Sequence, residues 1–434
     1  MSRGPAVVSL VLGLSLGGCF PSGGGGTSGN GGNTGGGDTT GTGGGSSATG
    51  GTAGPMINPS SSYPQNTPGA NFPYPQNHAL PNCSFPSYST DTVAQAYTNW
   101  KAAFFDGSKV IRPENGNDTV SEGIGYGMLI AVFMNDQPMF DTLSNFGKQH
   151  PSAKNDGLMT WCIPSGQSGS CSGSGSATDG DEDMAYALLM ASKQWNGGTY
   201  SSDAMNLIKA ILAHDVSGGV LEGGDGFNNT NELDPSYFAP SYYRAFAAFD
   251  TADSAAWMSL VGSVYGILAK ADQPDGLVPN WVNQGGTGVT VSNAMVDPYF
   301  GYDACRTPFR IGLDYCLNGE PAAQSYAQLI SGFYAGKATA TSLAAIDDGY
   351  TTTGGNPSGT LGDYAAGMAF LGPAGIGAMA AGQQDSLRDL VYVTLRADTT
   401  QASMKVPGTF SYYHGSWGVL SLLAMSGNFW DMTQ

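Results

Sequence analysis

The stretch Ala177-Thr-Asp-Gly-Asp-Glu-Asp-Met-Ala-Tyr-Ala-Leu-Leu-Met-Ala-Ser-Lys-Gln-Trp195 places four carboxylates at the start of an apolar helix. Acidic groups suit the positive end of a helix dipole, and Thr178 with Asp181 would form a capping box there. That role accounts for one or two acids, but not for Asp179, Asp181 and Asp183 together. We therefore expect a catalytic or ligand-binding carboxylate in this segment.

The same acids also copy the opening of an EF-hand calcium loop. An EF-hand needs glycine where Met184 stands and a bidentate glutamate where Met190 stands, so this alternative fails at two positions. The four histidines are scattered without the spacing of metal ligands, and the sequence holds no Cys-x-x-Cys motif. We expect no metal site and no cofactor.

Composition restricts the class of protein. The chain has 434 residues, of which 41% are hydrophobic, and this is enough for a sizeable core in one large domain or two. Its formal net charge is −18, and it has no cluster of lysine and arginine that could displace counterions from phosphates. Nucleic acid is therefore excluded as an expected partner.

The amino end has the pattern of an export signal. Arg3 precedes an apolar run over residues 6–16, and two glycines separate this run from Cys19. Leu16-Gly-Gly-Cys19 resembles the lipobox of bacterial lipoproteins, whose cysteine is acylated. We expect a signal peptide over residues 1–18, a lipidated Gly/Ser/Thr-rich linker over 19–60 and a catalytic domain over 61–434. The expected location is the bacterial (outer) membrane or cell surface, with extracellular release as the alternative.

Export permits disulfides among the five remaining cysteines, which are Cys83, Cys162, Cys171, Cys305 and Cys316. Cys162 and Cys171 flank a Gly/Ser loop that could close on itself. Cys305 and Cys316 lie near opposite ends of one predicted helix, too far apart to bond each other. Because five is odd, at least one thiol stays free, and the other pairings remain open.

The helical periodicity predicts twelve helices. They are expected to begin near Thr92, Glu122, Gln137, Gly180, Asp203, Ser241, Asp253, Pro308, Ala322, Asp363, Gln384 and Gly415. Every second helix from Glu122 is mostly apolar or small around its whole circumference, as buried helices are. These are residues 126–134, 184–190, 242–249, 364–371 and 417–425. We predict an all-α toroid of six inner and six outer helices, with an ordinary helical bundle or repeat array as the alternative.

The connections have unequal lengths. Those leading into the buried helices are long, over residues 107–121, 150–178, 215–240, 271–307, 336–361 and 396–414. Those leaving the buried helices are mostly short. Since long loops are seldom kept for packing, we expect the function at the end of the toroid where they gather.

Three buried helices begin with acids at that end, namely Glu122, Asp179 and Asp303, and these acids should converge on one axis. Pairs of carboxyl groups cleave glycosidic bonds, because one donates a proton and the other acts on the opposite face of the sugar. A proton donor at Glu122 would need its pKa raised by burial and by repulsion from Asp179. The alternatives are a dipole partner behind a Ser121 cap for Glu122, and a salt bridge to Arg306 for Asp303.

The loops at the same end carry aromatic and amide side chains that suit sugars. These are Trp161, Asn231, Tyr237, Phe238, Trp281, Tyr299, Tyr302, Tyr412 and Tyr413. Each ring alone is explained by packing. Beside three acids, the set favours a groove for a polysaccharide.

Four segments resemble the corresponding blocks of glycoside hydrolase family 8: residues 119–128, 177–195, 234–240 and 302–315. The resemblance runs from about Asn82 to the end of the chain. It implies an (α/α)6 barrel that hydrolyses internal β-1,4 bonds with inversion. It also implies that Glu122 is the general acid, Asp303 the general base, and Asp179 a residue that binds and distorts the sugar.

The residues that we expect to bind the substrate are Trp161, Tyr126, Tyr237, Tyr302, Arg306, Tyr412 and Tyr413. The aspartate at position 303 indicates the branch rich in endoglucanases and xylanases. We therefore expect a monomeric endo-β-1,4-glucanase acting on cellulose or a related β-glucan. The alternatives are an endo-xylanase, lichenase or chitosanase of the same fold, and a non-catalytic carbohydrate-binding protein.

Overall fold

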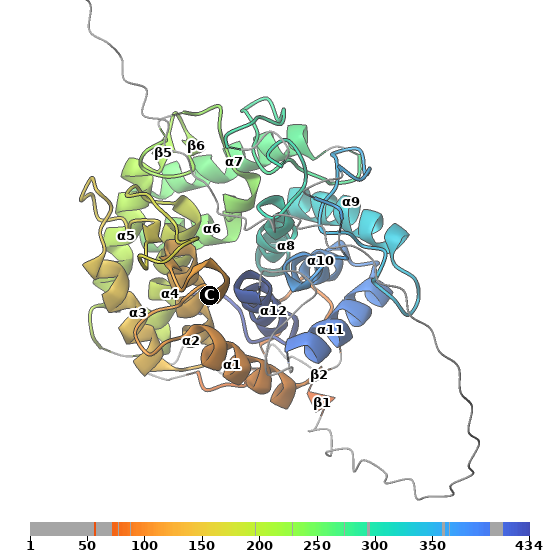
Figure 1. Ribbon diagram of the computed structural model, residues 1–434, viewed down its shortest axis with the longest axis horizontal. Helices are drawn as coiled ribbons and strands as arrows, with labels where there is room; N and C mark the ends of the chain where they lie inside the picture. The colour runs from red at the N-terminus through yellow and green to blue at the C-terminus, as the bar shows by residue number, and fades with distance from the viewer. Residues whose placement is uncertain are drawn as a thin grey trace, which may run out of the picture.

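The computed structural model describes residues 56–57 and 72–434, apart from 77, 87, 196, 228, 273, 293–295, 358–360, 364 and 400–410. The expected signal peptide and Cys19 lie outside the described residues, as does nearly all of the expected linker. Within the described part, twelve α-helices are arranged as two concentric rings (Figure 1). This confirms the all-α (α/α)6 barrel.

The inner ring consists of α2 (Ser121–Phe133), α4 (Thr178–Gln194), α6 (Pro240–Phe249), α8 (Thr307–Asn318), α10 (Met368–Ala381) and α12 (Ser411–Met425). Each inner helix contacts the next, and α12 contacts α2, so the ring is closed. Helix α10 is buried along its whole length, and α2 nearly so, because both are apolar or small on every side.

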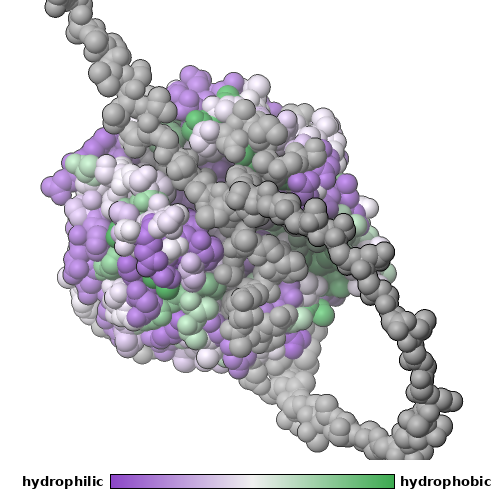
Figure 2. Space-filling view, in the orientation of Figure 1, coloured by the Kyte–Doolittle hydropathy of each residue, from purple (hydrophilic) through white to green (hydrophobic). Residues whose placement is uncertain are grey.

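The outer ring consists of α1 (Thr90–Phe104), α3 (Gln137–Gln149), α5 (Tyr200–His214), α7 (Ser254–Ala271), α9 (Pro321–Lys337) and α11 (Asp385–Thr399). These helices bury one face only. In α3, for example, Met139, Phe140 and Leu143 face the core. Figure 2 accordingly shows mostly hydrophilic and neutral residues on the side of the molecule where α3 and α5 lie.

The connections between the helices contain two-residue strands and short 3-10 helices. Three antiparallel pairs join β1 (Met56–Ile57) to β2 (Tyr88–Ser89), β3 (Thr119–Val120) to β4 (Cys162–Ile163), and β5 (Val216–Ser217) to β6 (Val220–Leu221). Three 3-10 helices are η1 (Pro113–Asn115), η2 (Pro235–Tyr237) and η3 (Ala304–Arg306). The long connections precede the inner helices as expected, and short ones such as 134–136 and 319–320 follow them.

The predicted helix starts agree with the structure to within a few residues, except at α10. The predicted start near Asp363 is wrong, because the helix begins at Met368. Gly362 adopts a left-handed φ of +75°, and Ala365 forms a β-bridge with Asp347, so the chain is still extended there. Tyr364, in the predicted helix, lies outside the described residues.

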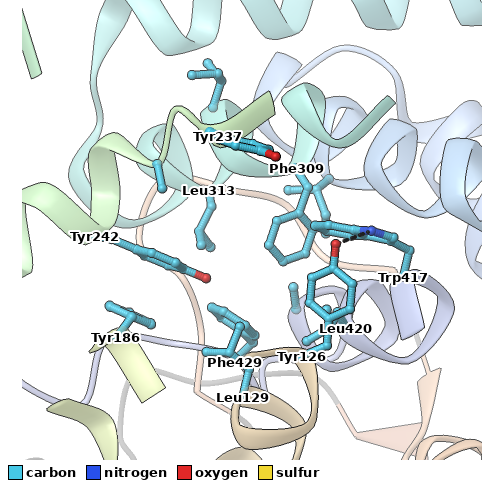
Figure 3. Close-up of a cluster of buried hydrophobic side chains, with 14 of the residues drawn as sticks. Tyr126, Leu129, Tyr186, Tyr237, Tyr242, Phe309, Leu313, Trp417, Leu420 and Phe429 are labelled. Carbon is cyan, nitrogen blue, oxygen red and sulfur yellow. Dashed lines mark hydrogen bonds between the residues drawn. The ribbon is translucent and has the colours of Figure 1, made fainter. Parts of the chain in front are cut away.

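Aromatic side chains fill the barrel axis (Figure 3). Tyr186 and Tyr242 stack with ring centroids 3.8 Å apart, and the indole of Trp417 donates a hydrogen bond to the hydroxyl of Tyr126 at 3.0 Å. Tyr126 lies one helical turn beyond Glu122 on α2. The axis is therefore a packed core, and the acids at the helix starts stand above it.

The cysteines form two disulfides, Cys83–Cys316 and Cys162–Cys171, while Cys305 is a free, buried thiol. The 162–171 loop closes on itself, a pairing that the sequence left open, and the prediction that Cys305 and Cys316 do not pair is confirmed. Across the described helices, none combines the length and apolarity that a membrane span requires.

Candidate active site

Arg306 joins the acids at the end of the barrel where the inner helices α2, α4 and α8 begin. Its Nη1 lies 3.1 Å from Glu122 Oε2 and 2.6 Å from Asp179 Oδ2. Its Nη2 lies 3.5 Å from Asp303 Oδ1 and 3.6 Å from Asp234 Oδ2. The arginine side chain is only 2% exposed. The structure thus brings together the three acids expected from the sequence and adds Asp234.

Four successive inner helices supply these acids. Glu122 and Asp179 are the second residues of α2 and α4. Asp234 precedes η2 at the start of α6, and Asp303 precedes η3 at the start of α8. Because the positive ends of helix dipoles meet here, the site favours negative charge.

The alternative in which Thr178 and Ser121 cap these helices is wrong. The N-cap positions are Ala177 and Val120, neither of which has a polar side chain. The hydroxyl of Thr178 instead donates to the carbonyl of Glu222 at 2.7 Å. Thr178 and the backbone N–H of Ser121 therefore bond to neighbouring loops, at the carbonyls of Glu222 and Trp161. Helix capping does not account for the acids.

The four carboxylates of the 178–183 segment point to different partners. Asp183 accepts two hydrogen bonds from the guanidinium of Arg310, and Glu182 accepts one from the hydroxyl of Tyr243 at 3.0 Å. Asp181 accepts the backbone N–H of Met159 at 3.2 Å. Burial raises the pKa of Asp181 and of Glu182 well above the usual range. Only Asp179 reaches Arg306, so one acid of the run belongs to the site.

Glu122 has the electrostatics of a proton donor. Its side chain is 15% exposed, and its Oε1 accepts a hydrogen bond from Tyr412 at 3.0 Å. Burial first, and the charge of Asp179 second, raise the pKa of Glu122 to about 7, against the opposing charges of Arg306 and Arg112. A large fraction of Glu122 therefore stays protonated at neutral pH.

Asp303 has a lower pKa than Glu122. Burial raises the pKa of Asp303 to about 6, and the charges of Asp297 and Asp179 act in the same direction, while the charge of Arg306 and the neighbouring Trp281 oppose them. Burial thus outweighs the cation that was expected to keep this group ionised. Even so, Asp303 is mostly ionised at neutral pH, where Glu122 still holds a proton.

The shared arginine also limits how far apart the two carboxyls can be. Glu122 Oε2 and Asp303 Oδ1 contact different nitrogens of one guanidinium, at 3.1 and 3.5 Å. Because those nitrogens lie about 2.3 Å apart, the two oxygens are separated by at most about 9 Å. The two carboxyls are therefore close enough to act as a pair on one glycosidic bond.

The aromatic residues expected at the site differ in position. The Tyr237 ring lies 5.1 Å from the guanidinium of Arg306, and Tyr413 donates to the carbonyl of Tyr302 at 2.6 Å. The carbonyl of Trp161 accepts the N–H of Ser121, one residue before Glu122. Tyr126 lies one helical turn below Glu122 and is fully buried in the axial core.

Two members of the site were not expected from the sequence. Asp234 precedes Pro235 and accepts the N–H of Ser236 at 2.7 Å, which is the pattern of an ordinary turn cap. Phe227 stacks on Trp281 at 5.5 Å between ring centroids, and its position depends on the path of a long loop. The Asp-Pro pair was a usable signal for the first, whereas no local signal marks the second.

A separate cavity of about 330 Å³ lies between α3, α4 and α5. Its lining includes three methionines, Met128, Met159 and Met184, and the ion pair of Lys148 and Asp203 at 2.6 Å. None of the acids bound to Arg306 lines this cavity, so it is not part of the site. In the portion of the chain that is described, no group of three or more His, Cys, Asp or Glu is arranged to hold a metal ion.

Comparison with known proteins gives consistent matches. The family described as glycosyl hydrolases family 8 matches residues 71–425. Endoglucanase C of Ruminiclostridium cellulolyticum is 32% identical over 392 residues, which cover 82% of this chain and 77% of that protein. Beta-glucanase of Niallia circulans is 30% identical over 402 residues, covering 86% and 92%. The apo structure of beta-1,3-1,4-glucanase from Paenibacillus sp. X4 is 29% identical, with a TM-score of 0.72 over 83% of this chain and 99% of that chain.

Proposed function

The chain belongs to glycosyl hydrolases family 8, and on that premise we propose that it is an inverting endo-β-1,4-glucanase acting on cellulose or a related β-glucan. The observation that carries the proposal is the pair of carboxyls on Arg306. Glu122, with a pKa of about 7, still holds a proton under conditions in which Asp303, with a pKa of about 6, has mostly lost its own. Inverting hydrolysis needs one carboxyl in each state.

The proposed reaction is a single displacement. The Glu122 carboxyl gives its proton to the glycosidic oxygen as the C–O bond breaks. A water molecule on the other face of the sugar attacks the anomeric carbon, and Asp303 takes the proton that this water releases. The positive charge that develops on the sugar is stabilised by the nearby Asp179 carboxylate. The proton gained by Asp303 and the one lost by Glu122 are then exchanged with solvent.

Arg306 and Tyr412 support the donor after it has reacted. Both contact the Glu122 carboxyl, through Nη1 at 3.1 Å and through the phenol hydroxyl at 3.0 Å. Charge-assisted hydrogen bonds of this kind stabilise a new carboxylate more than a neutral acid. The two residues therefore favour release of the proton once the leaving oxygen needs it.

Aromatic rings beside both carboxyls support a polymeric sugar substrate. Trp281, which lowers the pKa of Asp303, stacks on Phe227, with Tyr237 packed edge-on at 6.2 Å. Tyr412 stands on the side of Glu122. Rings on both sides of the reacting centre suit a chain that continues in both directions, as internal cleavage requires.

The relatives support a β-glucan substrate, since their names are endoglucanase, beta-glucanase and beta-1,3-1,4-glucanase. The last of these favours lichenan, a mixed-linkage β-glucan, as a second candidate. Reducing ends released from carboxymethylcellulose, lichenan, xylan and chitosan at equal mass concentration test the proposal. We expect one of the two β-glucans to be hydrolysed fastest.

Faster release from xylan or chitosan would overturn the proposed substrate. Saturable binding of a polymer without any product would instead indicate a non-catalytic carbohydrate-binding protein. The Glu122→Gln variant, purified in parallel, shows how much release comes from contaminating enzymes.

We also propose that the domain over residues 61–434 is exported by the signal over 1–18 and anchored through acylated Cys19 at the end of the linker over 19–60. The support is the lipobox-like Leu16-Gly-Gly-Cys19 and the low-complexity composition that follows it. We propose that the enzyme acts as a monomer. Phase partition in Triton X-114 tests the lipid anchor, and a full-length protein found in the aqueous phase would contradict it. Light scattering of the protein lacking residues 1–60 tests the monomeric state, and the mass of a dimer would contradict it.

A further inference from the structure

A buried asparagine holds the backbone on both sides of the proposed base. Asn280 lies in the loop between α7 and α8 and is 3% exposed. Its side-chain Oδ1 accepts the N–H of Gly301 at 3.0 Å and the N–H of Ala304 at 2.9 Å. These two residues bracket Tyr302 and Asp303. One amide oxygen therefore anchors both ends of the segment that carries Asp303.

The rest of Asn280 is anchored as well. Its Nδ2 donates to the carbonyl of Val296 at 3.2 Å, and its backbone N–H donates to the carbonyl of Tyr299 at 2.8 Å. Gly301 packs so closely that a Cβ there would lie 3.0 Å from Nδ2 and 2.9 Å from Leu361. At this position one short side chain must accept two hydrogen bonds and donate another. An asparagine amide has both groups, a carbonyl oxygen and an NH2.

The next two residues extend the same connection. Trp281 is buried and acts on the Asp303 carboxyl, whose pKa it lowers. Val282 exchanges two backbone hydrogen bonds of 2.8 Å with Leu233, the residue before Asp234. The segment 280–282 thus fixes the backbone on both sides of Asp303 and joins it to the backbone next to Asp234, the neighbouring acid on Arg306.

We propose that Asn280 is a positioning residue for hydrolysis, setting where the Asp303 carboxylate stands relative to the attacking water. This inference rests on the proposed function, in which Asp303 is the base. The functional contribution is separate from the stability that any buried hydrogen-bonded amide provides. A displacement of about 1 Å at a reacting group lowers turnover by about 100-fold.

Asn280→Ala is the principal test, with Asn428→Ala as the matched control. Asn428 is also buried, accepts the N–H of Gln76 at 2.6 Å and donates to Ser426. It follows the carboxyl end of α12, at the end of the barrel opposite the acids. Asn280→Ala leaves two buried N–H groups without this acceptor and Asn428→Ala leaves one, so both variants should lose thermal stability.

The kinetic results should differ between the two variants. On the polysaccharide that the wild type hydrolyses fastest, Asn280→Ala is expected to lower kcat by about 100-fold with KM changed by less than about threefold. Asn428→Ala should keep kcat within about threefold of the wild type. Equal kcat values for the two variants would overturn the inference.

Asn280→Asp decides the question if the alanine variant does not fold. It keeps the doubly accepting oxygen and the shape, but it adds a negative charge near Asp303, which Arg306, Asp297, Asp179 and Asp234 already face. The added charge should raise the pKa of Asp303, so the pH below which kcat/KM falls (the acid limb of its pH profile) should move to a higher value. The fall in kcat should be smaller than in Asn280→Ala. An unmoved limb with wild-type kcat would contradict the positioning role. If the wild type itself releases no sugar from any polymer, the proposed function fails instead.

Discussion

Replacing Glu122 by glutamine is expected to lower kcat on the preferred β-glucan by about 10²- to 10⁴-fold, which is the usual contribution of a general acid. The amide keeps the size of the side chain and can still accept from Tyr412, 3.0 Å away in the wild type. It cannot release a proton to the leaving oxygen. Affinity for a cello-oligosaccharide, measured by calorimetry, should therefore change by less than about threefold.

The choice of leaving group sharpens this test. A dinitrophenyl leaving group needs no protonation, so on an activated aryl β-cello-oligosaccharide the deficit of Glu122→Gln should largely disappear. The wild type should also lose activity as the pH rises through about 7, because Glu122, whose pKa is about 7, becomes deprotonated. The variant should lack that alkaline limb.

Glu182→Gln is the matched control. Glu182 is a buried glutamate of the inner ring that accepts from Tyr243 at 3.0 Å and does not contact Arg306. Its pKa is raised well above the usual range by burial, so an uncharged amide resembles its normal state. This control should keep kcat. A parallel loss of turnover and of binding in Glu122→Gln would mean that Glu122 is a structural acid.

Replacing Asp303 by asparagine is expected to lower kcat by a similar factor of about 10²- to 10⁴-fold, but with a different dependence on substrate. The attacking water needs a base whichever group leaves, so the activated aryl substrate should not restore activity. The acid limb of the wild type should lie near pH 6, because activity is lost as Asp303, whose pKa is about 6, takes up a proton. In Asp303→Asn that limb should be absent.

Asp297→Asn provides the control within the same loop. The charge of Asp297 raises the pKa of Asp303, so its removal should lower that pKa and move the acid limb to lower pH. Turnover at the optimum should stay close to that of the wild type. Recovery of Asp303→Asn on the activated substrate would contradict its role as the base.

Much of the fold follows from local sequence. The inner helices are apolar or small around their circumference and must be buried on all sides, which a closed ring achieves. The start of α10 was not predictable, because Gly362 and the Ala365–Asp347 bridge keep the chain extended beyond Asp363. Nor could spacing identify the Cys83–Cys316 disulfide, whose partners are 233 residues apart.

The site, like the fold, has residues that local sequence predicts and residues that only the folded chain brings together. Glu122, Asp179 and Asp303 stand out because a charged group at the start of a buried helix is unfavourable unless it has a partner. Asp234 escaped notice because it also serves as a turn cap. The position of Asn280 beside Gly301 and Ala304 depends on the course of residues 272–306, which no local preference determines. Likewise, the pKa values depend on distances to Arg306 that only the folded chain establishes.

The central claim is that Glu122 and Asp303 act from opposite faces of one sugar, with a water molecule attacking directly. Proton NMR of the anomeric signals during the first minutes of cello-oligosaccharide hydrolysis tests it most directly. The account predicts that the new reducing ends appear first as the α-anomer and then equilibrate by mutarotation. Initial accumulation of the β-anomer would show retention and contradict the assignment.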